Sequence, residues 1–381
     1  MLYLDAAATS PVRREALEAM WPYLTGDFGN PSSRHTVGES AARGLATAHE
    51  QVAAFLGCRP GEVVFTGSGT EADNMAVKGI ALANARGRHV VTSRIEHEAV
   101  LQSVDALVRL HGFEATFVSL DPSGFVTPDA LARAVRPDTT LVSLAHGNNE
   151  IGTVQDLAAL ADVTRPLGIP FHTDAVQTAG WLPTRVRDLG VDALSLAGHK
   201  LGAPKGIGAL FVAGRLPLEP LVHGGGQERG RRSGTENVAG AVALGVAVTL
   251  AAESRAAQAA EAASARDAFI AEVLGSVPGS RLTGPAEPSR RLPAHASFVF
   301  PGTHGESILL ELERRGVVSS SGSACSAGSD EPSHVLTALG YTDDVAQTAV
   351  RFTWQSDVTA LQLAGVAAAV RESVEAVGSL H

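Results

Sequence analysis

The sequence has few features of a secreted or membrane-bound chain. Only two of its 381 residues are cysteines, Cys58 and Cys325, which excludes the disulfide framework of a small secreted domain and favours a reducing compartment. No basic segment precedes an apolar one near Met1, so we expect no signal peptide. The longest weakly polar run, residues 238–252, is shorter than the roughly 20 residues that span a bilayer, and favours a buried core helix. The sequence therefore predicts a cytoplasmic protein without membrane attachment.

An excess of positive charge is also missing. The chain has 30 Lys and Arg residues against 40 Asp and Glu residues, for a net charge of −10. Its densest basic cluster, Arg229-Gly-Arg231-Arg232, is too small for a surface that binds a polyanion, so no direct nucleic-acid binding is expected. No repeat at a solenoid period is visible, and no metal site is predicted.

What the sequence does have is an alternation of helical and strand-like patterns. Apolar residues recur at helical spacing over residues 39–55, 71–85, 99–111 and 157–165. Strand-like runs cover residues 62–66, 89–93, 115–119, 140–145 and 169–173. This alternation predicts βα units and a mostly parallel sheet covered on both faces.

The amino-acid composition changes after Asn237. An Ala-rich helix is expected to reach about residue 274, and a stretch rich in Pro, Gly and Ser follows over 277–293. We place the domain change along this helix. Residues 15–255 then form the large domain, and residues 1–14 with 256–381 form the small one.

A lysine stands at a turn between two further apolar runs. Lys200 follows the run 191–196 and precedes the run 208–213, with Gly and Pro in between, which predicts a strand, a tight turn and a strand. A partly buried lysine at such a turn suits Schiff-base chemistry, because burial favours the neutral, nucleophilic amine. A solvated lysine in a hairpin would show the same local pattern.

An acid gives this lysine a partner. Asp174 follows the strand-like run 169–173, and strand ends at one edge of a sheet can lie close together. Pyridoxal phosphate needs a lysine that binds it covalently and a carboxylate opposite its pyridinium nitrogen. Lys200 and Asp174 together therefore favour a pyridoxal phosphate site.

A glycine turn supplies a candidate phosphate site. The segment Gly67-Ser-Gly69-Thr70 joins a strand-like run to a helix, so backbone N–H groups and the positive end of the helix dipole face an anion. The same segment resembles the dinucleotide fingerprint, with Glu96 at the end of the next strand. A nicotinamide dehydrogenase is thus an alternative, but it leaves Asp174 and Lys200 without a role.

These features belong to a longer ordered set of motifs. From Tyr3 to about Arg351 the chain resembles the cysteine desulfurases, which are class V, fold-type I enzymes dependent on pyridoxal 5'-phosphate (PLP). The resemblance implies an α/β fold, with a large domain built on a mostly parallel seven-stranded sheet and a smaller α+β domain. The matching segments are Tyr3-Leu-Asp-Ala-Ala-Ala-Thr9, Gly29-Asn-Pro-Ser-Ser-Arg-His35, Gly69-Thr-Glu-Ala-Asp-Asn74, Glu96-His-Glu-Ala-Val100, Asn148-Asn-Glu-Ile-Gly-Thr-Val-Gln155, His172-Thr-Asp-Ala-Val-Gln177, His199-Lys200, Pro204-Lys-Gly-Ile-Gly208, Arg232-Ser-Gly-Thr-Glu-Asn237, Ser320-Ser-Gly-Ser-Ala-Cys325 and Glu331-Pro-Ser-His-Val-Leu336.

The resemblance implies roles for four residues around the cofactor ring. Lys200 would bind the cofactor covalently and move protons. Asp174 would pair with the pyridinium nitrogen, and Gln177 would hydrogen-bond the ring hydroxyl. His97 would stack on the ring face and assist proton transfer.

The resemblance also implies how the phosphate is held. Gly69, Thr70 and His199 would contact it from the same chain. Thr235 matches a family residue that reaches the phosphate from the neighbouring subunit. A homodimer with composite sites is therefore expected.

Cys325 determines the expected reaction. It lies in a stretch of small polar residues, 317–332, whose composition is typical of a mobile loop, which suits a thiol that must reach both a cofactor and an acceptor. The resemblance implies that Asn149 and Arg351 hold the carboxylate of L-cysteine while Cys325 attacks its sulfur. The products would be L-alanine and a persulfide on Cys325. Cys58 is interpreted as structural.

The form of the cysteine segment narrows the resemblance further. Ser320-Ser-Gly-Ser-Ala-Cys325 resembles the group with a long mobile loop, which donates sulfur directly to scaffold or carrier proteins. The acceptor stays open between iron–sulfur cluster assembly, tRNA thiolation and DNA phosphorothioation.

Three departures from the family pattern suggest a divergent branch. Ala197 replaces a serine, Gly202-Ala203 precedes Pro204, and Phe352-Thr-Trp354-Gln355 follows Arg351. A selenocysteine lyase or another class V enzyme of the aminotransferase type is an alternative, although the presence of Cys325 disfavours an aminotransferase. A non-enzymatic scaffold with this fold is disfavoured by the intact lysine, acid and cysteine.

Overall fold

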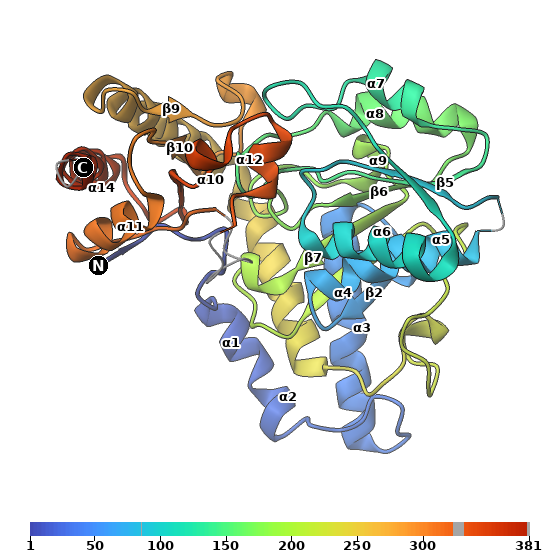
Figure 1. The fold of residues 1–381 in the computed structure, drawn as a ribbon. Coiled ribbons are helices and arrows are strands. Elements are labelled where there is room, and N and C mark those ends of the chain that lie inside the picture. The colour runs from blue at the N-terminus through green and yellow to red at the C-terminus, as the bar shows by residue number, and fades with distance from the viewer. Residues whose placement is uncertain (85, 323–330, 379–381) are drawn as a thin grey trace.

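The computed structural model describes residues 1–84, 86–322 and 331–378. Its largest unit is a seven-stranded sheet with the strand order β2-β8-β7-β6-β5-β3-β4 (Figure 1). The strands are β2 (Val63–Thr66), β3 (His89–Thr92), β4 (Glu114–Phe117), β5 (Thr139–Ser143), β6 (Phe171–Asp174), β7 (Ala193–Ala197) and β8 (Gly208–Val212). All neighbours run parallel except β8, which is antiparallel to both β2 and β7. The predicted mostly parallel sheet is confirmed.

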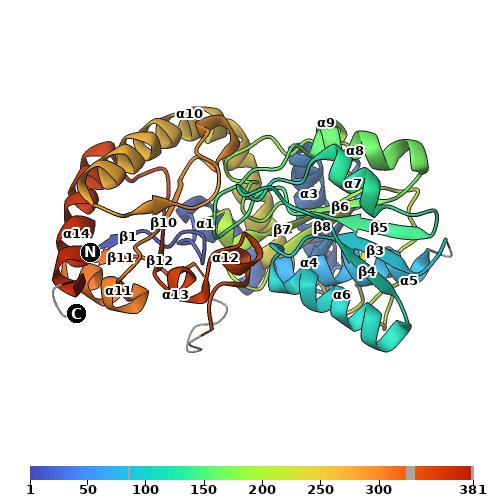
Figure 2. The same cartoon turned by 45° about the horizontal axis from the view of Figure 1, so that its top comes forward.

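Helices cover both faces of this sheet, as Figure 2 shows. One face packs on α4 (Gly69–Asn74), a π-helical turn η2 (Met75–Gly79), α5 (Ile80–Ala83) and α6 (Glu98–His111). The other packs on α3 (Thr36–Leu56), α7 (Pro128–Ala134), α8 (Leu157–Thr164) and the first half of α10 (Val238–Ser276). Because both faces are covered, strands such as β2, β3 and β5 are buried along their whole length, which explains their continuous apolar runs.

A second unit is built from the two ends of the chain. Strands β9 (Arg281–Leu282), β10 (His295–Val299) and β12 (Ala349–Thr353) form an antiparallel sheet, and β1 (Leu2–Tyr3) pairs in parallel with β11 (Val317–Val318). It is completed by the helices α11 (Gly305–Arg314), α12 (His334–Ala338), α13 (Asp343–Ala346) and α14 (Ala360–Gly378). At the periphery of the first unit lie α1 (Arg14–Met20), α2 (Pro22–Thr25) and α9 (Val186–Leu189).

Helix α10 links the two units. It is long and apolar enough to cross a membrane by length and composition alone. Leu244 and Ala251 in its first half are buried in the core of the large sheet, and Ala262 and Val273 in its second half are buried in a second core with Phe298. The run 238–252 is therefore a buried core helix, as expected. We propose the domain division at residue 255, and the separation of the two cores supports it.

Candidate functional site

A cavity of about 330 Å³ opens where the strands of the large sheet end. The predicted site residues that line it are Gly69, Thr70, His97, Asn149, Asp174, Gln177, His199, Lys200 and Arg351. Thr235 is exposed and does not line the cavity of its own chain. Cys325 lies outside the described residues. The cavity thus brings together side chains from both units of the fold.

At one end of the cavity, a glycine turn leads into α4. The Ser68 side chain accepts a hydrogen bond from Glu71 N–H and caps the helix, while the Glu71 carboxylate accepts from Gly67 N–H at 2.7 Å. A Cβ on Gly69 would lie 3.0 Å from both the Ala197 and the Val176 side chains. A side chain at this position would therefore crowd two residues that line the cavity.

His199 closes the same end of the cavity. Its Nδ1 lies 3.1 Å from the hydroxyl of Thr9. Burial, assisted by the charge of Lys200, lowers the pKa of His199 to about 4. The imidazole is therefore neutral near pH 7 and offers a single N–H donor.

Lys200 ends a short 3₁₀ turn, η4 (Gly198–Lys200), which joins β7 to β8. The predicted strand, turn and strand are confirmed. Its Nζ donates to the backbone carbonyl of Ala7 and, at 2.7 Å, to that of Ala8. The amine is therefore held at the cavity wall by the N-terminal segment of the chain.

Asp174 stands at the end of β6, on the strand next to the one that leads to Lys200. Its carboxylate accepts a hydrogen bond from Val176 N–H at 2.8 Å. Burial raises the pKa of Asp174, while His97, the Val176 amide and Lys200 act in the opposite direction. Gln177 also lines the cavity, and its side chain donates to the carbonyl of Ala7 at 3.1 Å.

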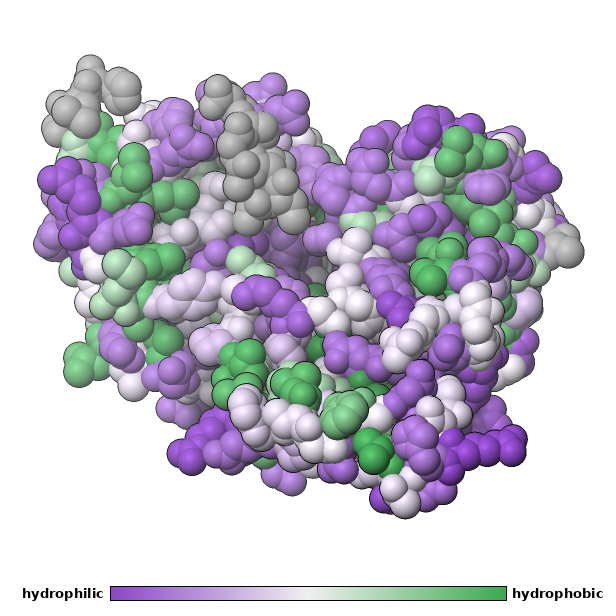
Figure 3. All heavy atoms as spheres, turned by 90° about the horizontal axis from the view of Figure 1, so that it is seen from below, coloured by the Kyte–Doolittle hydropathy of each residue, from purple (hydrophilic) through white to green (hydrophobic). Residues whose placement is uncertain are grey.

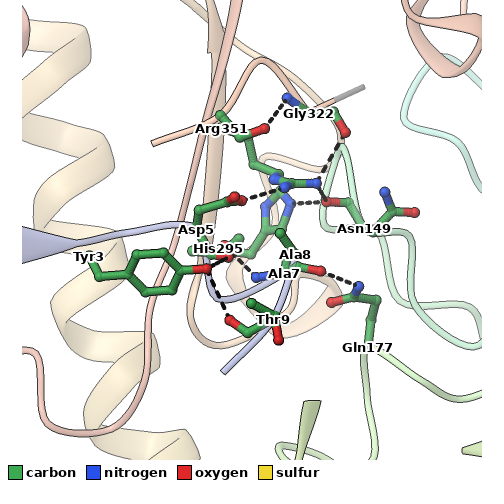
Figure 4. A network of polar contacts seen from close by, with 12 residues as sticks. Tyr3, Asp5, Ala7, Ala8, Thr9, Asn149, Gln177, His295, Gly322 and Arg351 are labelled. Atoms are coloured by element: carbon green, nitrogen blue, oxygen red, sulfur yellow. Dashed lines mark hydrogen bonds and ion pairs between the residues drawn. The ribbon is translucent and has the colours of Figure 1, made fainter. Parts of the chain in front are cut away.

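Arg351 lies on β12 and is 2% exposed. Figure 4 shows its guanidinium donating to the backbone carbonyls of Asn149 and Gly322, at 3.0 and 3.1 Å, and to the Asp5 carboxylate at 2.7 Å. The Nε of Arg351 has no hydrogen-bond partner among the described residues. Three of its five N–H donors are thus used within the protein, which fixes the arginine in place.

Sequence reasoning missed the contribution of the N-terminal segment. Asp5 and Ala7 belong to a motif that carried the resemblance, but nothing in the sequence shows that they contact Arg351 and Lys200. The parallel pairing of β1 with β11 and the bridge between Asp5 and Thr353 bring this segment to the cavity. The contacts of Asp5 with Arg351 and of Ala7 with Lys200 join residues 346 and 193 positions apart, which local patterns do not reveal.

The departures from the family pattern fall into two kinds. Ala197 faces the cavity beside Gly69, where it adds no hydroxyl. Trp354 is 1% exposed and packs edge-on against Phe269 in the second core, with ring centroids 6.2 Å apart. Trp354 is therefore a core residue rather than a substrate ligand.

The residues of the cavity fit pyridoxal phosphate. An amine, Lys200, and a carboxylate, Asp174, face one space from neighbouring strand ends, which is the pair that this cofactor requires. A Cβ on Gly69 would narrow the open cradle beside the helix start, where a phosphate finds free N–H donors. Among the described residues no group of three or more His, Cys, Asp or Glu side chains could hold a metal ion.

Comparison with known proteins identifies the family. The aminotransferase class-V family model matches residues 2–361. A cysteine desulfurase IscS of Dictyoglomus turgidum is 46% identical over 353 residues, covering 92% of this chain and 89% of the relative. A putative cysteine desulfurase IscS 1 of Bacillus subtilis is 42% identical, covering 98% of each. A solved NifS-like protein superimposes with a TM-score of 0.90 at 33% identity, covering 98% of this chain and 99% of that one.

Fold, cavity and comparisons together define a PLP-dependent enzyme of fold type I, and the chain belongs to the class-V aminotransferase family. Within that family it is a cysteine desulfurase. The predicted fold class, family and type of enzyme are confirmed.

Proposed function

We propose that this chain removes sulfur from L-cysteine in the cavity and passes it on as a persulfide of Cys325. The observation that carries the proposal is the convergence of Lys200, Asp174 and Arg351 on one cavity in a chain of this family. These three groups supply an amine for the cofactor, an acid for its ring nitrogen and a cation for the substrate carboxylate.

The cofactor, when bound, withdraws electrons from the substrate Cα and so makes a bond to that atom easier to break. Asp174 would place a negative charge opposite the ring nitrogen, and Gln177 and His97 would contact the ring. Gly69, Thr70 and the neutral His199 would hold the phosphate. Lys200 would hold the cofactor through its Nζ, and as a free amine Nζ would accept the Cα proton and later return a proton to the product.

Arg351 and Asn149 would hold the substrate carboxylate. Both residues line the cavity, and the guanidinium is the cation that a carboxylate would meet there. A hydrogen bond from a guanidinium to a carboxylate contributes roughly 1.5–3 kcal/mol. This contact selects α-amino acids and orients the Cα–H bond toward Lys200.

The sulfur is taken by Cys325. Its thiolate attacks the substrate sulfur, the S–S bond forms as the Cβ–S bond breaks, and the remaining three-carbon fragment takes up a proton to become L-alanine. Gly322, three positions before Cys325 in the sequence, lines the cavity and supports this reach. Burial raises the pKa of the Cys58 thiol to about 12, so Cys58 is not a candidate nucleophile.

We further propose a cytoplasmic homodimer whose sites are shared between subunits. The exposure of Thr235, outside its own chain's cavity, supports a contact of this residue with the partner's site. The persulfide would be passed to an acceptor protein in iron–sulfur cluster assembly, with tRNA thiolation and DNA phosphorothioation as the other destinations that the sequence resemblance allows.

The test is to incubate the purified protein with PLP, L-cysteine and a thiol reductant, beside Cys325→Ala and Cys58→Ala, and to measure alanine and sulfide together. We expect equal amounts of both products from the wild type and from Cys58→Ala, and neither from Cys325→Ala. Equal alanine formation without Cys325 would overturn the persulfide mechanism and favour a lyase that does not use this thiol.

A further inference from the structure

A second buried carboxyl shares the cavity wall with Asp174. Asp73 lies on α4, is 2% exposed and lines the same cavity. Its Oδ1 has no hydrogen-bond partner among the described residues. A buried carboxyl oxygen without a partner is costly, and the proposed function gives Asp73 no role.

Asp73 is attached to the strand that carries Asp174 through a chain of polar side chains. Ser195 on β7 stands opposite Asp174 in the strand register and hydrogen-bonds the Asp73 side chain. The Nε2 of His172, two residues before Asp174, lies 3.0 Å from Ser195 Oγ and 3.7 Å from Asp73 Oδ1. Its Nδ1 lies 2.9 Å from the hydroxyl of Ser143 on β5.

Burial also determines the charge of His172. It lowers the pKa of His172 to about 3, so the ring is neutral and has one donor and one acceptor nitrogen. In the tautomer with its proton on Nε2, Ser143 donates to Nδ1 and the Nε2–H of His172 donates to Ser195. The Ser195 hydroxyl then has its own hydrogen left for Asp73.

The charges around the two acids are unequal. Asp174 accepts from the Val176 amide, and His97 and Lys200 favour its ionised form. Burial and the nearby Asp174 and Glu96 both raise the pKa of Asp73, and the bond from Ser195 is the influence that opposes them. Two neighbouring buried carboxyls do not both ionise readily, so the proton goes to the acid with less support for its charge.

We propose that Asp73 is a positioning residue that acts through Asp174: as an uncharged carboxyl held by Ser195, it leaves Asp174 as the single ionised acid facing the cofactor's ring nitrogen. This inference rests on the proposed cofactor site. In this proposal Asp73 acts only through Asp174.

The experiment compares Asp73→Asn with Asp73→Ala. Asparagine keeps the shape and the neutral state of the protonated acid, whereas alanine removes both the side chain and its bond to Ser195. The dissociation constant of PLP is measured by titrating each apoprotein, together with the pH dependence of the bound cofactor's absorption band and the melting temperature of each apoprotein.

We expect Asp73→Asn to bind PLP within about twofold of the wild type and with an unchanged pH profile, and Asp73→Ala to bind about tenfold more weakly, a loss of the size expected for one buried polar contact. Ser195→Ala, which leaves the carboxyl in place but removes its hydrogen bond, should fall between these two. A merely structural role would lower the melting temperature of Asp73→Ala without changing its PLP affinity.

Two results would overturn the inference. If Asp73→Asn binds PLP as weakly as Asp73→Ala, an ionised Asp73 is required. If Asp73→Ala binds like the wild type, Asp73 has no positioning role. Should Asp73→Ala not fold, the pH profile of Asp73→Asn decides, because loss of an ionised group would shift it and replacement of a neutral one would not. Failure of the wild type to bind PLP would instead refute the proposed function itself.

Discussion

At the scale of single residues, Arg351 shows how burial sets what the cavity can bind. A guanidinium that is 2% exposed needs several acceptors, and here two backbone carbonyls and the carboxylate of Asp5 supply them. Asp5 is thus an internal counter-charge. It keeps the arginine in place while the cavity contains no substrate.

Changing this counter-charge has a predictable effect on substrate binding. Asp5→Asn removes the charge-assisted bond but keeps the side-chain shape, so Arg351 loses part of its orientation. We expect the KM for L-cysteine to rise about tenfold, with kcat changed less than threefold, because the lost contact contributes roughly 1.5–3 kcal/mol. Steady-state kinetics of alanine formation measures both constants.

Tyr3→Phe is a matched control for this variant. It removes the bonds from the Tyr3 hydroxyl to the carbonyls of Asp5 and Thr9, at 2.9 and 3.1 Å, without changing any charge near Arg351. Its KM should stay near the wild-type value. A KM that falls in Asp5→Asn would show that Asp5 competes with the substrate instead of orienting its ligand.

At the scale of elements, the phosphate turn depends on the close approach of a neighbouring strand. Gly208 begins β8, and a Cβ there would lie 2.6 Å from the carbonyl carbon of Ser68 and 2.8 Å from the carbonyl oxygen of Leu196. Both are backbone atoms, which cannot move aside as the end of a side chain can. The position of the turn before α4 is therefore coupled to the β7–β8 hairpin that carries Lys200.

Gly208→Ala tests this coupling. We expect it to destabilise the protein by about 1–3 kcal/mol, as overpacking of a core does, and to weaken PLP binding because the turn that contacts the phosphate shifts. Gly275→Ala is the control, since a Cβ there meets nothing within 4 Å and alanine favours the helix α10. Thermal unfolding and PLP titration of both variants measure the effect, and normal PLP binding by Gly208→Ala would contradict it.

The elements also differ in how well the sequence predicts them. Local patterns predict the β7–β8 hairpin and the strands that follow helices. Each of these elements is specified by a few consecutive residues that Gly or Pro bounds. The helix expected over 71–85 begins earlier, at Gly69, and contains the π-helical turn η2. The position of Asp5 against Arg351 and the network from Asp73 to Ser143 were not predictable, since they depend on strand order and register. The role of Cys325 stays a prediction.

At the scale of the whole molecule, two cores joined by α10 leave one face with apolar side chains in solvent. Trp21, Leu24 and Phe28, in and after α1 and α2, are 61%, 54% and 70% exposed. In Figure 3, which views the molecule from below, apolar patches interrupt the hydrophilic surface. Exposed apolar groups of this size are typical of an interface, which agrees with the proposed second subunit.

A mixture of two variants tests whether that subunit completes the site. Alone, Lys200→Ala should be inactive, and Thr235→Ala should bind PLP about five- to tenfold more weakly because it loses a hydrogen bond to a charged phosphate. If Thr235 serves the partner's cavity, each mixed dimer has one doubly altered site and one intact site. Co-expression with two different tags and tandem purification isolates that mixed dimer.

The mixed dimer should regain wild-type PLP affinity and desulfurase activity at one of its two sites, measured at a PLP concentration that leaves the Thr235→Ala homodimer mostly empty. As a control, a dimer of wild type with a Lys200→Ala/Thr235→Ala double variant should have no intact site, because its wild-type lysine faces the altered Thr235 position. If Thr235 served its own chain, these outcomes would be exchanged: the first mixture would stay weak and the control would keep one normal site.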